Sequence, residues 1–96
     1  MMSDMDMIRE LEATLRERAG RPPAESYTAR LLAAGEDEIV KKVGEEAIEG
    51  VLAAKGQGDE RLVSEAADLV YHLLVLLQSR GLDWAAVEAE LARRRK

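Results

Sequence analysis

An all-α domain is the fold class that this sequence predicts, and three observations support the prediction. The apolar residues are mostly Ala, Leu and Val, with no Phe and few other aromatics, a mixture that suits helix packing better than sheets. Apolar positions recur at spacings typical of helices, and no segment alternates as a strand would. Short Gly-rich or Pro-rich stretches separate these segments, as expected for antiparallel helical neighbours. We expect residues 1–96 to form one domain.

The first helix is expected to end near Gly20, and Ser3 or Asp4 can cap its start. The Arg-Pro-Pro sequence at 21–23 breaks it, because proline fixes φ and lacks the amide donor that a helix interior needs. A short second helix is expected over about 26–34. The chain therefore begins with two helices of unequal length.

Three further helices are expected over about 36–55, 59–79 and 83–96. The Gly-Gln-Gly sequence at 56–58 ends the first of them, and Gly81 ends the second. The aspartate that begins each of the last two helices is its expected cap. The short connection at 56–58 favours an antiparallel hairpin of the two central helices.

The helix over 36–55 has two distinct faces on a helical wheel. A sector of about 80° holds an apolar seam that we expect to face the core; it consists of Val40, Val43, Ala47, Val51 and Ala54. The opposite side is mainly acidic and contains Glu38, Lys42, Glu45, Glu46 and Glu49. This helix therefore combines a packing surface with a concentration of carboxylates.

Three glutamates on the acidic side can aim at one point, because Glu46 and Glu49 are three residues apart and Glu45 and Glu49 are four apart. Like charges at these spacings destabilise a helix slightly, so the arrangement favours a bound cation. The alternative is a solvated acidic face on which Lys41 and Lys42 form exposed ion pairs.

The helix over 59–79 places carboxylates beside a very apolar segment. Residues 69–77 are apolar in nearly every direction, which indicates burial on all sides. Glu65 and Asp68 lie one turn apart near its start and point roughly the same way as His72. Carboxylates in such a place are costly unless something pairs with them.

An antiparallel hairpin would bring the acidic pairs of the two helices together. Glu49 is seven residues before Gly56 and Glu65 is six residues after Asp59, so their levels match within one turn. Oxygen ligands without histidine or cysteine select Mg²⁺, with Mn²⁺ as a possible substitute, over zinc. Four or five carboxylates would then converge on one predicted metal site, and a merely acidic surface is the alternative.

Four other side chains are candidates for substrate contact. Lys41 and Lys42 are placed to bind phosphates, and Arg30 on the short helix is a weaker candidate of the same kind. His72 is the fourth, although a lone histidine on a buried helix is more often a hydrogen-bonded core residue.

Composition and charge limit the kinds of site, partner and cellular location that we expect. A net charge of −5 argues against nucleic-acid binding, and the absence of cysteine excludes thiolate sites and disulfides. No signal-peptide pattern and no apolar run of about 18 residues appears, so we expect a cytoplasmic protein without a membrane partner. The segment 69–77 needs cover on every face, which favours a homodimer that completes the hairpin to a four-helix-type bundle.

Three segments carry a further signal: SYT at 26–28, KKVGEEAIE at 41–49 and EAADLVYH at 65–72. Together they resemble the phosphoribosyl-ATP pyrophosphohydrolases of histidine biosynthesis. The wider superfamily, the all-α MazG-like nucleotide pyrophosphohydrolases, is marked by ExxE, a spacer and ExxD. The resemblance covers about residues 5–92, with fifteen residues between the two motifs.

This resemblance implies hydrolysis of phosphoribosyl-ATP to phosphoribosyl-AMP and pyrophosphate, the second step of histidine biosynthesis, at a magnesium site. It implies that the magnesium ligands are Glu46, Glu49, Glu65 and Asp68. It also implies catalytic roles for Glu45, Glu46 and Glu49, with Glu45 adding a metal ligand or orienting the attacking water. It also agrees with a homodimer. Two alternatives stay open: a housekeeping MazG-like nucleoside-triphosphate pyrophosphohydrolase with the same metal site, and a non-catalytic helical dimerisation module with an acidic face.

Overall fold

Five α-helices and one short 3-10 turn make up the computed structural model, which describes residues 4–95. They are α1 (Asp4–Ala19), η1 (Pro23–Glu25), α2 (Tyr27–Ala34), α3 (Glu36–Gly56), α4 (Asp59–Ser79) and α5 (Trp84–Arg94). This part of the chain contains no strand, so the predicted all-α fold class is confirmed. The possible cap at Ser3 lies outside the described residues.

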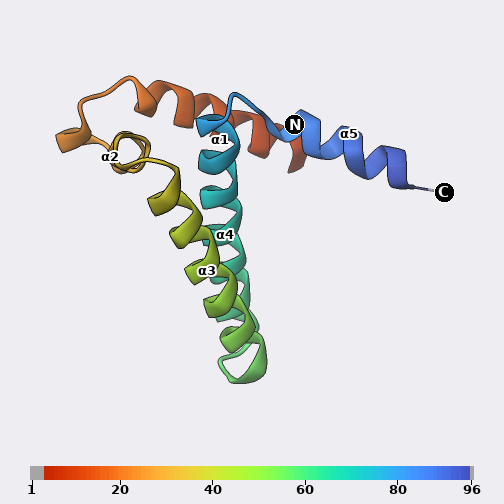
Figure 1. Ribbon diagram of the computed structural model, residues 1–96. Coiled ribbons are helices and arrows are strands. Elements are labelled where there is room, and N and C mark those ends of the chain that lie inside the picture. The colour runs from red at the N-terminus through yellow and green to blue at the C-terminus, as the bar shows by residue number, and fades with distance from the viewer. Residues whose placement is uncertain (1–3, 96) are drawn as a thin grey trace.

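The long antiparallel hairpin of α3 and α4 dominates the shape of the chain (Figure 1). The helices α1 and α2 lie across the end of the hairpin opposite its turn, and α5 extends away from it. Five buried residues form the core at that end: Leu15, Leu31, Ile39, Leu74 and Val75. The acidic residues Glu46, Glu65 and Asp68 lie in the middle of the hairpin, between this core and the turn.

Of the two aspartates predicted to cap the last two helices, Asp83 does so and Asp59 does not, and Ser26 also caps the start of α2. The Ser26 hydroxyl accepts the amide three residues on at 3.1 Å, and the Asp83 carboxylate does the same for α5 at 3.1 Å. The N-cap of α4 is Gly58, without a side-chain cap, while Asp59 is its first residue. Gly58 has a φ of 91°, which an L side chain rarely adopts, and this allows the tight reversal between α3 and α4.

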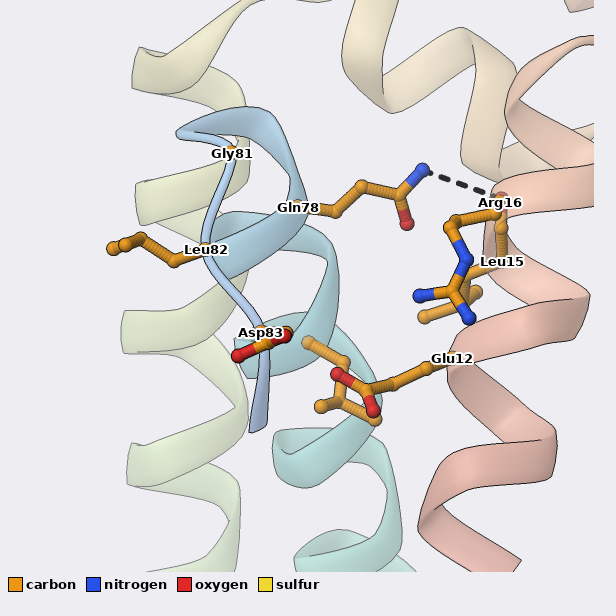
Figure 2. A pocket seen from close by; sticks show the side chains of 8 residues that line it. Glu12, Leu15, Arg16, Gln78, Gly81, Leu82 and Asp83 are labelled. Carbon is orange, nitrogen blue, oxygen red and sulfur yellow. Dashed lines mark hydrogen bonds between the residues drawn. The ribbon is translucent and has the colours of Figure 1, made fainter. Parts of the chain in front are cut away.

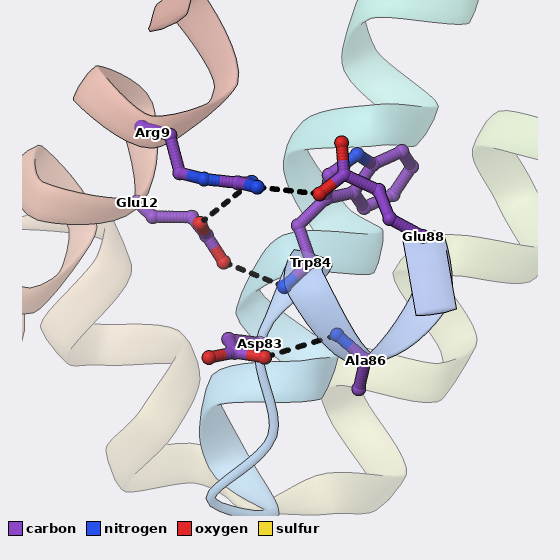
Figure 3. Close-up of polar contacts among 6 residues, drawn as sticks. All are labelled: Arg9, Glu12, Asp83, Trp84, Ala86 and Glu88. Carbon is purple, nitrogen blue, oxygen red and sulfur yellow. Dashed lines mark hydrogen bonds and ion pairs between the residues drawn. The ribbon is translucent and has the colours of Figure 1, made fainter. Parts of the chain in front are cut away.

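A polar network attaches the start of α5 to α1 (Figure 3). The Glu12 carboxylate accepts the backbone amide of Trp84 at 2.7 Å, and Arg9 donates to Glu88 on the next turn of α5. Glu12 is nearly buried, at 9% exposure, so this amide is a significant partner for its charge. The first turn of α5 is thus anchored, while the rest of the helix projects outward.

A cavity of about 320 Å³ lies beside this network, between α1 and the turn from α4 to α5. Figure 2 shows Glu12 and Arg16 of α1 facing the turn that carries Gly81 and Asp83, with Gln78 bonded to the Leu15 carbonyl. None of the predicted metal ligands lines this cavity.

The apolar seam predicted on α3 does not face the core of the chain, and this prediction is wrong for the single subunit. Val40 and Val51 are 51% and 62% exposed. Ile39 and Ala53 are fully buried instead, and Glu46 lies midway between them at the same seven-residue spacing. The face that packs on α4 therefore carries the carboxylate, and the more apolar face is left without a partner within the described residues.

The helix α4 is long and apolar enough, by length and composition, to cross a membrane, and 22% of its apolar window is buried inside the chain. Its polar side chains have partners within the domain: Glu65 pairs with Arg61, and His72 is bonded to Tyr27. We therefore interpret α4 as a helix that packs against other helices of the domain.

Candidate metal centre

Three of the four predicted metal ligands converge in the middle of the hairpin. Glu46 comes from α3, and Glu65 and Asp68 come from consecutive turns of α4. Each offers a carboxylate oxygen, and these oxygens lie within 4.8 Å of one another. Glu65 is buried, Glu46 is half-buried and Asp68 is exposed, so the cluster opens to solvent on one side.

The fourth predicted ligand, Glu49, lies outside this tight group. It is exposed on α3, one turn after Glu46. Its charge nevertheless contributes to raising the pKa of Glu65, which places it within electrostatic reach of the cluster. Glu45 is also exposed and its carboxylate lies 3.6 Å from the Lys42 ammonium.

Burial is the main cause that raises the pKa of the Glu65 carboxyl. The neighbouring carboxylates raise it further, and Arg61 opposes them from an ion pair of 3.0 Å. The ionised form of Glu65 therefore carries an electrostatic cost that a divalent cation would relieve. The donor set consists of carboxylate oxygens alone, and this chemistry fits Mg²⁺ or Mn²⁺.

Lys42 is the predicted substrate residue that lies nearest to the cluster. Its ammonium is 4.0 Å from the Glu46 carboxylate. The Tyr27 hydroxyl is the main cause that raises the pKa of Lys42, with smaller contributions from Glu45 and Glu46, so the ammonium keeps its charge. Lys41, by contrast, is exposed on α3.

Two hydrogen bonds join α2 to α4, and a third, within α4, reaches the backbone of Asp68. The His72 Nδ1 donates to the Asp68 carbonyl at 2.8 Å, and its Nε2 accepts from the Tyr27 hydroxyl at 2.8 Å. The Thr28 and Tyr71 hydroxyls form the second contact at 2.6 Å. His72 is buried with both ring nitrogens bonded, as in the core-histidine interpretation.

Arg30 lies on the exposed side of α2, away from the carboxylate oxygens. Its guanidinium is 5.8 Å from the Tyr27 ring centroid, and it donates to the Pro23 carbonyl. It lines an open groove together with Tyr27, Leu31 and Glu38.

Two residues near the cluster were missed by the sequence analysis. Arg61 is four residues before Glu65 on the same helix, so the helical spacing alone could have indicated the pair. Tyr27 was treated only as part of a motif, and its bond to His72 joins residues 45 positions apart. No local pattern indicates a contact of that range.

A helical hairpin that brings Glu46 of the ExxE motif together with both carboxylates of the ExxD motif has the arrangement that the resemblance to all-α nucleotide pyrophosphohydrolases implies. Residues 8–95 match the family described as phosphoribosyl-ATP pyrophosphohydrolase. The chain belongs to this family and is therefore a hydrolase, which confirms the resemblance and argues against the non-catalytic module.

Individual relatives match along almost the whole chain. A phosphoribosyl-ATP pyrophosphatase of Pelotomaculum thermopropionicum is 53% identical, over 99% of this chain and 97% of that protein. One from Pyrobaculum islandicum is 51% identical over 93% of this chain and 95% of its own length. One from Methanoculleus marisnigri is 50% identical, over 99% of this chain and 100% of that protein.

Proposed function

We propose that this protein hydrolyses phosphoribosyl-ATP to phosphoribosyl-AMP and pyrophosphate at a magnesium–carboxylate site, as the second step of histidine biosynthesis. Family membership and the names of the relatives support the reaction. The observation that carries the site is the convergence of Glu46, Glu65 and Asp68 oxygens within 4.8 Å across two helices.

Glu46, Glu65 and Asp68 would hold Mg²⁺, with Glu49 as the nearby fourth carboxylate. When bound, the metal supplies positive charge that screens the polyphosphate and stabilises the departing pyrophosphate. Without it, the acidic cluster would repel a substrate of the same sign.

The hydrolysis breaks one phosphoanhydride bond, forms a bond from the water oxygen to phosphorus, and requires a group that takes the water proton. Glu45 and Glu49 are exposed carboxylates on the α3 side of the cluster and are our candidates for orienting this water and accepting its proton. The Lys42 ammonium lies 3.6 Å from the Glu45 carboxylate, so a cation stands next to one of the groups that we propose orient the water.

Substrate contact is proposed for Lys42, Lys41, Arg30 and His72. Lys42 is adjacent to the cluster and suits a phosphate oxygen. Arg30 lines the groove beside Tyr27, where the part of the nucleotide beyond the phosphates would lie. His72 can reach substrate only by exchanging its hydrogen bond to Tyr27.

We also propose a cytoplasmic homodimer, without nucleic-acid or membrane partners. Large apolar side chains are exposed along the hairpin, including Ile48 at 63%, Val51 at 62% and Val63 at 68%. Such a surface is unusual for a monomer and is explained by a second hairpin that packs on it.

The direct test is a substrate panel with and without Mg²⁺, in which pyrophosphate release is measured. Phosphoribosyl-ATP should be the preferred substrate, chelation should abolish turnover, and Glu46→Gln should lower kcat/KM at least about 100-fold because metal charge stabilisation is worth several kcal/mol. Glu10→Gln, an exposed change on α1, should leave the rate unchanged. Preference for a free nucleoside triphosphate would contradict the proposal and indicate the housekeeping activity.

A further inference from the structure

Arg61 contacts the most buried carboxylate of the cluster from the solvent side. Its Nη2 lies 3.0 Å from the Glu65 Oε1, one helical turn away. The arginine side chain is 53% exposed, whereas that of Glu65 is 6% exposed. A solvent-exposed cation therefore reaches a carboxylate that is otherwise shielded from water.

The pair gives Glu65 a positive neighbour next to the carboxylates of Glu46 and Asp68. Glu46 and Asp68 both have oxygens within 4.8 Å of those of Glu65. Two cations close to one carboxylate repel each other, so a divalent ion among these oxygens and the guanidinium at its present distance oppose each other. The guanidinium end of this ion pair is 53% exposed, so water screens it and a divalent ion can displace it.

We propose that Arg61 and the divalent metal compete for Glu65, so that Arg61 sets the metal affinity of the cluster by neutralising Glu65 until the metal displaces it. This inference rests on the metal site of the proposed function. It assigns Arg61 a tuning role: the residue lowers the affinity for the ion while it stabilises the metal-free fold.

The test is the affinity of the substrate-free protein for Mn²⁺, measured by electron paramagnetic resonance. Arg61→Gln should bind Mn²⁺ more tightly than wild type, by about threefold to tenfold, because the ion no longer has to displace or oppose a cation. Arg61→Lys, which keeps the charge on a different side chain, should fall between the two.

The matched control is Arg21→Gln. Arg21 also pairs with a glutamate four residues away, Glu17, but this pair lies on and after α1, outside the cluster. The control removes the same charge from the molecule, so its Mn²⁺ affinity should equal that of wild type. An equal gain in both variants would show a general charge effect and would overturn the proposal.

Thermal unfolding supplies a second readout. Without metal, Arg61→Gln should lower the Tm because Glu65 loses its counter-ion, and saturating Mg²⁺ should remove most of the deficit. A purely structural role for Arg61 would lower the Tm equally with and without Mg²⁺ and leave the Mn²⁺ affinity unchanged, and this result would overturn the competition.

The outcome is separable from that of the proposed reaction. Tight Mn²⁺ binding that responds to Arg61, combined with no turnover of phosphoribosyl-ATP, would contradict the reaction and support the competition. Absence of Mn²⁺ binding in wild type and Arg61→Gln alike would overturn the metal site and the competition together.

Discussion

At the scale of single residues, the carboxylates of the hairpin differ more than their shared residue type indicates. Glu65 is buried and paired with Arg61, Glu46 is half-buried near Lys42, and Asp68 is exposed. Three of the four carboxylates predicted to meet do so, because ExxE and ExxD place carboxylates on one side of each helix, and Glu49 lies outside their tight group. The sequence does not predict the burial of Glu65, which depends on contacts from the neighbouring helix.

The raised pKa of Glu65 leads to a prediction about pH. Its protonation favours the metal-free folded state, so its stabilising contribution is present below the ordinary value of 4.5 and is lost as pH rises through the raised pKa. Metal binding needs the ionised form, so Mn²⁺ affinity should fall as pH falls through that same raised pKa.

The measurement is Tm and Mn²⁺ affinity as functions of pH, for wild type and Glu65→Gln. Near neutral pH without metal, Glu65 of the wild type is ionised and does not provide the stabilisation of its protonated form. Lowering the pH should therefore raise the Tm of the wild type relative to that of Glu65→Gln. A Tm difference between the two proteins that does not change with pH would contradict this account of Glu65.

At the scale of elements, α2 is tied to α4 by hydroxyl and imidazole contacts rather than by apolar packing alone. Tyr27 and Thr28, at the start of α2, bond to His72 and Tyr71 on α4. The capping residue Ser26 sets where α2 begins, and so places both side chains next to α4. The SYT motif therefore has a structural reason: one residue caps the helix and the next two attach it.

We expect Tyr27→Phe to lower the free energy of unfolding by about 1–2 kcal/mol, because the buried His72 Nε2 loses its donor. The variant should also raise KM more than it lowers kcat if α2 positions the groove that holds the nucleotide. Urea unfolding and steady-state kinetics measure the two effects. The control is Ser79→Ala, which removes an exposed hydroxyl bonded within its own helix and should change neither the stability nor the kinetics. A Tyr27→Phe protein as stable as wild type would contradict the attachment of α2 to α4.

At the scale of the whole molecule, the α3–α4 hairpin exposes an apolar surface on one side and encloses carboxylates on the other. The apolar seam of α3 does not pack on the core of its own subunit, since Val40 and Val51 are exposed there. The second subunit proposed above would cover them and complete the four-helix-type bundle.

Introducing a charge on this surface should therefore break the dimer. Val51→Glu is expected to raise the dimer dissociation constant at least about tenfold, because an unpaired carboxylate would have to be buried in the interface. Sedimentation equilibrium measures the constant. Ala13→Glu, an equally drastic change at an exposed position of α1, should leave it unchanged. A monomeric wild type, or a Val51→Glu protein that dimerises as well as wild type, would contradict the predicted interface.

Local patterns in the sequence by themselves determined the helices, the two acidic motifs and the family to which the chain belongs, because helical periodicity, glycine and proline breaks and motif spacing all act over a few residues. Only the tertiary structure decided which face of α3 packs on α4, that Glu65 is buried, and that Tyr27 bonds His72. These three features depend on how each helix is rotated about its own axis relative to the helix that it packs on. That rotation is set by the sum of all contacts across the hairpin, so no single segment of the chain contains it.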